Sequence, residues 1–313
     1  MSTIGENLPR APAIKERLSN GRLIPYLLVG PTILVVFLVT IGPLLWSLWL
    51  SFTRWKPGSI AFQNPEFTGV ENFVWLVTNE RFIASVVNFA YYGGVGVLLQ
   101  VALGTLLALA LYNHVENRVL RVGLLTLFTV PMMYAPLVAG RIWQLLFLPG
   151  GGVVNGLLGT VGLTGVGWLN SRWLGLTSIM IADTWQWVGL PLLIVYGGRA
   201  SLSESMYEAA RVDGASRWMT FRRITFPQLR NLIVIAGLLR FMDAYKFFDK
   251  LFIMTGGGPG TATELPTYFA YLVGFQNFNI GQAAALTWVL GLGSVVTLFL
   301  FWRYMSTVQG GTN

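Results

Sequence analysis

Long apolar stretches separated by short polar ones dominate the pattern of this chain. A transmembrane helix needs about 20 largely apolar residues, and six stretches meet that length. They are Leu23–Phe52, Ile83–Leu111, Val122–Leu148, Leu174–Tyr196, Gln228–Met254 and Ile280–Trp302. No stretch alternates polar and apolar residues over short runs, as membrane β-strands do. The pattern therefore predicts an all-α membrane protein, a six-span helical bundle over residues 23–305, with polar tails at residues 1–22 and 306–313.

Composition supports a membrane protein and excludes several chemistries. The chain is 54% hydrophobic and only 11% charged, whereas soluble domains carry about 25% charged residues. It has no cysteine, so it has neither a disulfide framework nor a thiolate metal site. Its one histidine, His114, falls in a predicted loop between spans, which argues against a histidine-based metal site or catalytic triad. We therefore expect no catalytic residues and no metal ligands.

Basic residues are distributed unevenly between the two sides of the predicted bundle, and this bias orients membrane proteins. With the N-terminus in the cytoplasm, thirteen of the 21 lysines and arginines lie inside: Arg10, Lys15, Arg17, Arg22, Arg118, Arg121, Arg199, Arg211, Arg217, Arg222, Arg223, Arg230 and Arg303. Five lie outside: Arg54, Lys56, Arg81, Arg172 and Lys250. The bias predicts that both termini are cytoplasmic. No clustered basic face of the kind that binds nucleic acid accompanies it.

The polar stretch Ser201–Pro227 holds the densest charge in the chain. Ser201 and Glu204 have the spacing of a capping box and predict the start of a short helix. Gly214 is placed to end that helix in a left-handed conformation, and a second short basic helix is predicted from Ser216. The proline at the end of the stretch opens the next apolar segment, where a missing N–H costs little. The sequence predicts a helix–glycine–helix elbow on the membrane face, called the elbow below.

The elbow resembles the EAA loop of ABC importer permeases, with its signature EAA---G---------I-LP. The matching residues are Glu208, Ala209, Ala210, Asp213, Gly214, Ala215, Ile224 and Pro227. The chain departs from the pattern at Phe226, where leucine is usual, and at Ser203, where proline is frequent. The resemblance implies that the elbow inserts into a cleft on a separate ATPase subunit, with Glu208 pairing with a basic residue there. The alternative is an amphipathic cytosolic linker with no special role.

Further phrases on the opposite side of the predicted membrane resemble carbohydrate importer permeases of the maltose and glycerol-phosphate type. They are TGVENFVWL at residues 68–76, a glycine-rich element at 150–170, and the run TGGGPGT at 255–261 followed by Thr263, Tyr268, Tyr271, Phe275 and GQAAA at 281–285. No Walker A pattern, G-x-x-x-x-G-K-[ST], occurs in the chain, and TGGGPGT has no following lysine to hold phosphate. An ATPase would therefore be a separate polypeptide.

This resemblance implies a type I ABC importer permease fold in a bacterial inner membrane, with alternating access in place of chemistry on the substrate. The implied partners are a second homologous permease that forms a heterodimer with this chain, two copies of an ABC ATPase, and an extracytoplasmic sugar-binding protein. The chain itself would bind no cofactor, since ATP and Mg would belong to the ATPase. The alternatives from other classes are an ion-gradient-driven secondary transporter, which predicts an inverted repeat, and a membrane-embedded enzyme, which needs clustered polar ligands.

Charged residues inside the fifth predicted span are candidates for the substrate site, because a charge at the bilayer centre is costly. Helical spacing places Arg240, Asp243, Phe247 and Lys250 on one face. The resemblance implies a sugar held by residues just before and just after the elbow, at the positions Asp183, Trp187, Leu190, Arg240, Ala244 and Phe247. Carboxylate and guanidinium groups bind hydroxyls, and indole rings pack on sugar C–H faces. The alternatives are an Arg240–Asp243 pair that only neutralises itself, and an anionic sugar bound by the arginine.

Overall fold

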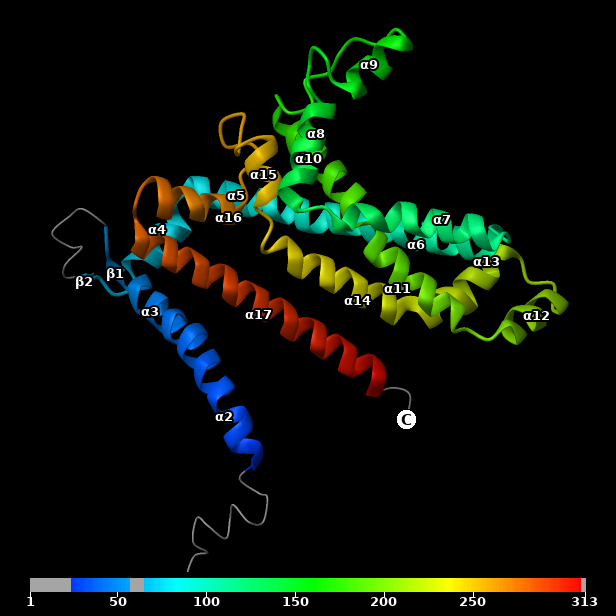
Figure 1. The fold of residues 1–313 in the computed structure, drawn as a ribbon, viewed down its shortest axis with the longest axis horizontal. Coiled ribbons are helices and arrows are strands. Elements are labelled where there is room, and N and C mark those ends of the chain that lie inside the picture. The colour runs from blue at the N-terminus through cyan, green and yellow to red at the C-terminus, as the bar shows by residue number, and fades with distance from the viewer. Residues whose placement is uncertain (1–23, 57–64, 311–313) are drawn as a thin grey trace, which may run out of the picture.

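The computed structural model describes residues 24–56 and 65–310, so the predicted tail at 1–22 lies outside the described residues. Its long helices lie roughly along one axis, with β1, β2 and α4 near one end and α12 at the other (Figure 1). Four helices in the described part are long and apolar enough to cross a membrane: Leu28–Ser51, Glu80–His114, Arg217–Ala244 and Ile280–Ser306. Two bent helix pairs bring the number up to six if each pair is one span, in agreement with the sequence prediction.

The first span consists of α2 (Ile24–Val36), the π-helical turn η1 (Phe37–Ile41) and α3 (Gly42–Ser51). Much of it is exposed, with side chains such as Leu38 and Val39 available to lipid. A short antiparallel hairpin of β1 (Thr53–Arg54) and β2 (Glu66–Phe67) follows, and α4 (Glu71–Thr78) leads to the second span.

The second span is the long helix formed by α5 (Glu80–Tyr91), the π-helical turn η3 (Tyr92–Gly96) and α6 (Val97–His114). The side chain of Asn79 accepts a hydrogen bond from Phe82 N and so caps its start. At Gly104 it packs closely on α11: a Cβ there would lie 2.9 Å from the backbone nitrogen of Leu192. Only glycine permits this approach, as small residues do at membrane helix contacts.

The third and fourth spans are bent. In the third, α7 (Arg118–Thr129), the 3₁₀ turn η4 (Val130–Met133) and α8 (Pro136–Leu146) include a bend of 104°. Pro131 is the second residue of η4 and Pro136 begins α8; proline lacks the N–H that would continue a helix. The short helix α9 (Val153–Thr160) follows. In the fourth span, α10 (Arg172–Trp187) meets α11 (Gly189–Ala200) at 43°.

The elbow forms as a helix–glycine–helix unit, with one correction. Its first helix, α12 (Glu204–Val212), begins after Ser203 without a side-chain cap, and Ser201 Oγ donates to Gly197 O instead. The predicted capping box is therefore wrong, because the carboxylate of Glu204 is held elsewhere. Gly214 has a φ of +71°, and Ala215 N donates to Ala210 O over 2.9 Å. The left-handed stop at Gly214 is confirmed.

The second elbow helix continues directly into the fifth span. It consists of α13 (Arg217–Thr220), the π-helical turn η5 (Phe221–Thr225) and α14 (Phe226–Ala244), and Ser216 caps it through Met219 N. Pro227 thus lies after the π turn within a continuous helix. The predicted span through Met254 is wrong: the helix ends at Ala244, and α15 (Asp249–Met254) is a separate segment.

The last part of the chain contains α16 (Pro266–Tyr271), the π-helical turn η6 (Leu272–Gln276) and α17 (Ile280–Gly310). The sixth span lies in α17, so the predicted boundary with a tail at residue 306 falls inside a helix. In the TGGGPGT loop, Thr263 Oγ1 donates to Gly258 O, and Thr263 also bonds Thr255. Thr255 and Thr263 therefore shape the loop itself.

Candidate functional site

The carboxylate of Asp183, on α10, is the centre of a buried polar network. Arg240 Nη2, on α14, lies 2.8 Å from Asp183 Oδ2, and Lys250 Nζ, on α15, pairs with Asp183 Oδ1. The three side chains are only 1–2% exposed. Burying an ion costs several kcal/mol, and this cost is offset only where partners and hydrogen bonds satisfy the charge. Two cations from separate segments supply them here.

The second span completes the network. Tyr92 OH donates to Asp183 Oδ2 over 2.8 Å, and Gln100 Nε2 donates to the same oxygen over 2.7 Å. Gln100 Oε1 in turn accepts from Arg240 Nε over 2.7 Å. Tyr92 lies in the π-helical turn η3, and the centroid of its ring is 4.4 Å from that of Phe247. The second, fourth and fifth spans therefore meet at Asp183.

A cavity of about 130 Å³ opens beside the network, and we call it the Asp183 cavity. Its lining residues are Pro136, Asp183, Trp187, Arg240, Asp243, Lys246, Phe247, Phe248, Asp249 and Lys250. Arg240 lies 4.8 Å above the ring of Trp187, at the distance of a cation–π contact. The side chain of Asp243 is 42% exposed and pairs with Arg240 at 3.2 Å and with Lys246 at 3.7 Å. Three carboxylates and three cations thus line one space.

The structure brings five of the seven predicted substrate residues to this cavity: Asp183, Trp187, Arg240, Asp243 and Phe247. Leu190 and Ala244 do not line it, and Ala244 is 2% exposed within the main apolar core. The predicted Arg240–Asp243 pair exists, but Arg240 also pairs with Asp183, so it does not stand alone.

Sequence reasoning misplaced Lys250 in an outer loop, whereas it is buried against Asp183. It also gave no role to Tyr92 or Lys246, and it treated Gln100 as a polar residue of the second span that either faces a pathway or only holds the bundle together. Tyr92 left no signal in the sequence. For Lys250 a signal was present, because its helical spacing from Arg240 places both residues on one face of the predicted helix.

The elbow presents its predicted coupling residues to solvent. Glu208, Ala209, Asp213 and Gly214 are exposed, Pro227 is exposed on the following helix, and Ala210 is buried against the elbow's own turn. Val212 beside them is 87% exposed. Among the described residues, Glu208 forms no ion pair. An unpaired carboxylate next to an exposed apolar side chain is suited to contact with another chain.

A buried arginine anchors the elbow to the spans, a role that sequence reasoning missed. Arg199, at the end of α11, is 4% exposed and lies between two tyrosine rings, 4.2 Å from that of Tyr112 and 3.9 Å from that of Tyr207. Its Nη1 lies 3.2 Å from Glu204 Oε1, which also accepts from Tyr112 OH. Cation–π contacts of this kind contribute about 2 kcal/mol when desolvated. The α12 helix is thus fixed to α6 and α11.

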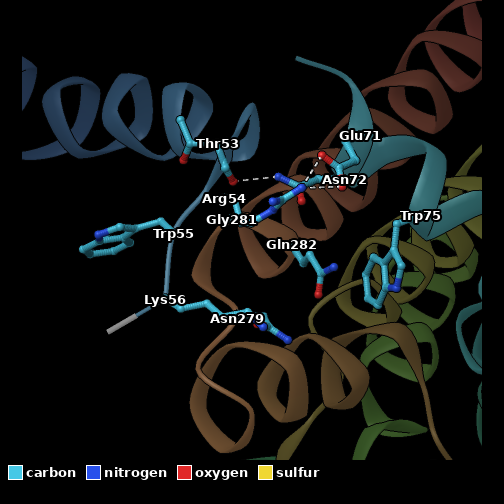
Figure 2. A pocket seen from close by; sticks show the side chains of 10 residues that line it. All are labelled: Thr53, Arg54, Trp55, Lys56, Glu71, Asn72, Trp75, Asn279, Gly281 and Gln282. Atoms are coloured by element: carbon cyan, nitrogen blue, oxygen red, sulfur yellow. Dashed lines mark hydrogen bonds and ion pairs between the residues drawn. The ribbon is translucent and has the colours of Figure 1, made fainter. Parts of the chain in front are cut away.

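At the opposite end, hydrogen bonds fix the β1–β2 hairpin beside a second cavity of about 140 Å³. Figure 2 shows Arg54 directed at Glu71, with both carboxylate oxygens within 2.9 Å of its Nη2. Asn72 Nδ2 donates to the carbonyls of Ser51 and Thr53 over 2.9 Å each. The asparagine of the TGVENFVWL phrase is therefore a structural residue that holds the hairpin to α4.

Comparisons with known proteins agree with this architecture. Residues 100–306 match the family described as binding-protein-dependent transport system inner membrane component. The chain is 34% identical over 292 residues to the probable ABC transporter permease protein y4oQ of Sinorhizobium fredii, covering 92% of each chain. It is 30% identical over 278 residues to the trehalose/maltose transport system permease protein MalF of Thermococcus litoralis, covering 88% of each.

A solved structure shows the same fold. It is the bacterial alginate ABC transporter in complex with an alginate pentasaccharide-bound periplasmic protein, with a TM-score of 0.77 and 23% identity, covering 93% of this chain and 96% of that one. The bent spans, the long second helix and the protruding elbow thus occur in an ABC importer permease fold, as the resemblance implied. The chain belongs to the family of binding-protein-dependent transport system inner membrane components.

Proposed function

We propose that this chain is the permease subunit of an ATP-driven ABC importer for a sugar and forms half of its translocation pathway. The observation that carries the proposal is the Asp183 cavity, in which carboxylates, cations and the ring of Trp187 meet between bent spans. At about 130 Å³ it would be this chain's part of a larger site completed by the second permease. Broken helices with polar groups near the bilayer midplane mark transporter binding sites. Two relatives, named for trehalose/maltose and for alginate, belong to systems that handle sugars.

The charge balance of the cavity favours a neutral sugar over an anionic derivative. Asp183 already has two cationic partners, and Asp243 is shared between Arg240 and Lys246. No cation is left with an unmatched charge for an anionic ligand. Hydroxyl groups, in contrast, both donate and accept hydrogen bonds, so they can bind paired carboxylates and guanidinium groups without displacing them. The ring of Trp187 would pack on the sugar's C–H face.

In this proposal the elbow connects the chain to the separate ATPase subunit. The α12 helix, which carries the exposed Glu208 and Val212, lies at the end of the molecule opposite the hairpin (Figure 1), and a separate ATPase would dock there. The assembly would comprise a second homologous permease, two ATPase copies that hold ATP and Mg, and an extracytoplasmic sugar-binding protein. It would lie in a bacterial inner membrane with both termini of this chain in the cytoplasm.

Reconstitution of the assembled transporter in liposomes tests the proposal. Uptake of a labelled gluco-oligosaccharide is expected to require ATP and the binding protein, and to persist when ionophores abolish every ion gradient. Uptake that continues without ATP and stops with the ionophores would instead identify a gradient-driven transporter.

Arg240→Ala is expected to reduce uptake by about 100-fold, roughly 2.7 kcal/mol of barrier, while the ATPase still copurifies. The reason is that Arg240 joins Trp187 to both carboxylates, whereas Asp183 retains Lys250 in the variant. The measurement is initial uptake rate against copurified ATPase. Arg172→Ala, which removes an exposed arginine that does not line the cavity, is the matched control with a change of less than about threefold. Wild-type uptake by Arg240→Ala would exclude this residue from the site.

A further inference from the structure

A cavity of about 520 Å³ lies beneath the elbow, between it and the ends of the membrane helices; we call it the elbow cavity. Its lining residues are Leu109, Tyr112, Asn113, His114, Arg199, Glu204, Tyr207, Arg211, Ala215, Arg217, Thr220, Phe221 and Thr225. Ligand pockets typically enclose about 300–1,000 Å³. The cavity therefore has the volume of a ligand site, and the transport pathway at Asp183 does not include it.

The lining of the elbow cavity is basic. Arg199, Arg211 and Arg217 face a single carboxylate, that of Glu204, which pairs with Arg199. Within residues 24–56 and 65–310, Arg211 and Arg217 have no acidic partner within 4 Å. Two positive charges thus remain unmatched in a concave space, which favours an anionic ligand.

Arg199 provides a second, independent indication of a ligand. The side chain is 96% buried, and its Nε–H has no acceptor within the described part of the chain. An unmet buried donor costs about 1–3 kcal/mol. The rings of Tyr112 and Tyr207 cover both faces of the guanidinium, so an acceptor must approach along its edge. Phosphate oxygens bind arginine in this edge-on geometry.

The neighbouring side chains place the cavity at the level of lipid headgroups. Trp218 is 68% exposed and stacks on Phe221, a lining residue, with ring centroids 5.5 Å apart. Phe226, one turn further, is 46% exposed. Exposed aromatic residues concentrate at the membrane–water interface, and basic pockets between membrane helices on the cytoplasmic side bind anionic headgroups.

We propose that the elbow cavity binds the phosphodiester headgroup of an anionic phospholipid through Arg199, Arg211 and Arg217. The acyl chains would lie along Phe221 and the exposed rings beside it. Because Arg199 also fixes α12 to α6 and α11, the bound headgroup would stiffen the elbow and raise the amount of sugar moved per ATP hydrolysed. This regulatory half rests on the proposed function, whereas the binding half does not.

The test compares two double variants of the full chain, purified with its partner subunits. Arg211→Gln with Arg217→Gln removes the two unmatched charges. Arg118→Gln with Arg230→Gln removes two exposed basic charges outside the cavity. The protein is titrated with phosphatidylglycerol, and native mass spectrometry counts the lipid molecules that remain bound. Phosphatidylcholine is the zwitterionic reference.

The cavity variant is expected to bind phosphatidylglycerol roughly 30-fold more weakly than wild type, since each of the two arginines near a membrane surface contributes about a fivefold factor. The control variant is expected to match wild type. Equal loss in both double variants would overturn the site, because it would reflect general surface charge. Inorganic phosphate that competes fully with the lipid at millimolar concentration would also overturn the assignment, in favour of a soluble ligand.

Proteoliposomes with and without phosphatidylglycerol test the regulatory half. The measured quantity is the number of sugar molecules transported per ATP hydrolysed. In the wild type this ratio is expected to fall when phosphatidylglycerol is withdrawn, and in the cavity variant it is expected to be low with either lipid composition. If the wild-type ratio were the same with and without phosphatidylglycerol, the proposed regulation by the lipid would be overturned. Failure of the proposed function is distinguishable, because then no ATP-dependent uptake occurs in any lipid while headgroup binding persists.

Discussion

Asp183→Asn is expected to destabilise the protein more than any other single neutralisation in the described chain. Removal of this charge leaves Lys250 buried without a carboxylate, and Arg240 with only its longer contact to Asp243. Breaking a buried pair by removal of one partner typically costs about 3–5 kcal/mol. We expect the thermal unfolding midpoint of the purified protein to fall by on the order of 10 °C, together with loss of uptake.

Two further variants separate this effect from a general loss of charge. Asp243→Asn removes the carboxylate that is 42% exposed, and it is expected to lower the midpoint by less than about 3 °C. Asp183→Asn combined with Lys250→Gln should recover part of the midpoint lost in the single variant, because one orphaned cation is removed with its partner. An unchanged midpoint in Asp183→Asn would show that the network does not stabilise the bundle.

Glu208→Arg is expected to abolish copurification of the ATPase and to reduce uptake by more than about 100-fold. Glu208 is exposed and has no ion-pair partner among the described residues, so its reversal leaves the fold of this chain unchanged. The loss would come from like-charge repulsion against a basic residue on the docked subunit, which costs several kcal/mol at an interface. Affinity purification and ATP-dependent uptake are the measurements.

Glu116→Arg provides the matched reversal, because Glu116 is exposed in the loop between α6 and α7, outside the elbow. It should retain both the ATPase and uptake. Gly214→Val tests the shape of the elbow, since a β-branched residue is strained at the φ of +71° that Gly214 adopts. If both elbow variants retained full ATPase copurification and uptake, the elbow would not be the coupling element.

The spans and the elbow could be predicted from the sequence because their signals are local. About 20 apolar residues specify a span, and Gly214 reports the end of α12 through its own backbone preference. Pro131 and Pro136, which lack the backbone N–H that would continue a helix, likewise lie at the bend between α7 and α8. In each case the physical cause lies within a few residues of the structural feature.

The contacts that define the two sites could not be predicted in the same way, because their partners are far apart in the chain. Tyr92 and Gln100 reach Asp183 across more than 80 residues, and no local pattern marks them. The break after Ala244 was missed because apolar periodicity continues through it. Glu204 has the spacing of a capping residue, yet its carboxylate bonds Arg199 and Tyr112. Tertiary packing decided between these options.

The equal numbers of acids and bases around the Asp183 cavity have an energetic consequence for transport. A neutral solute held among them adds no formal charge, so its passage requires no electrical work. Each uncompensated elementary charge would require about 2.3 kcal/mol per 100 mV. In the proposed importer, the ATP needed for each sugar molecule would therefore be the same in an energised and in a depolarised cell.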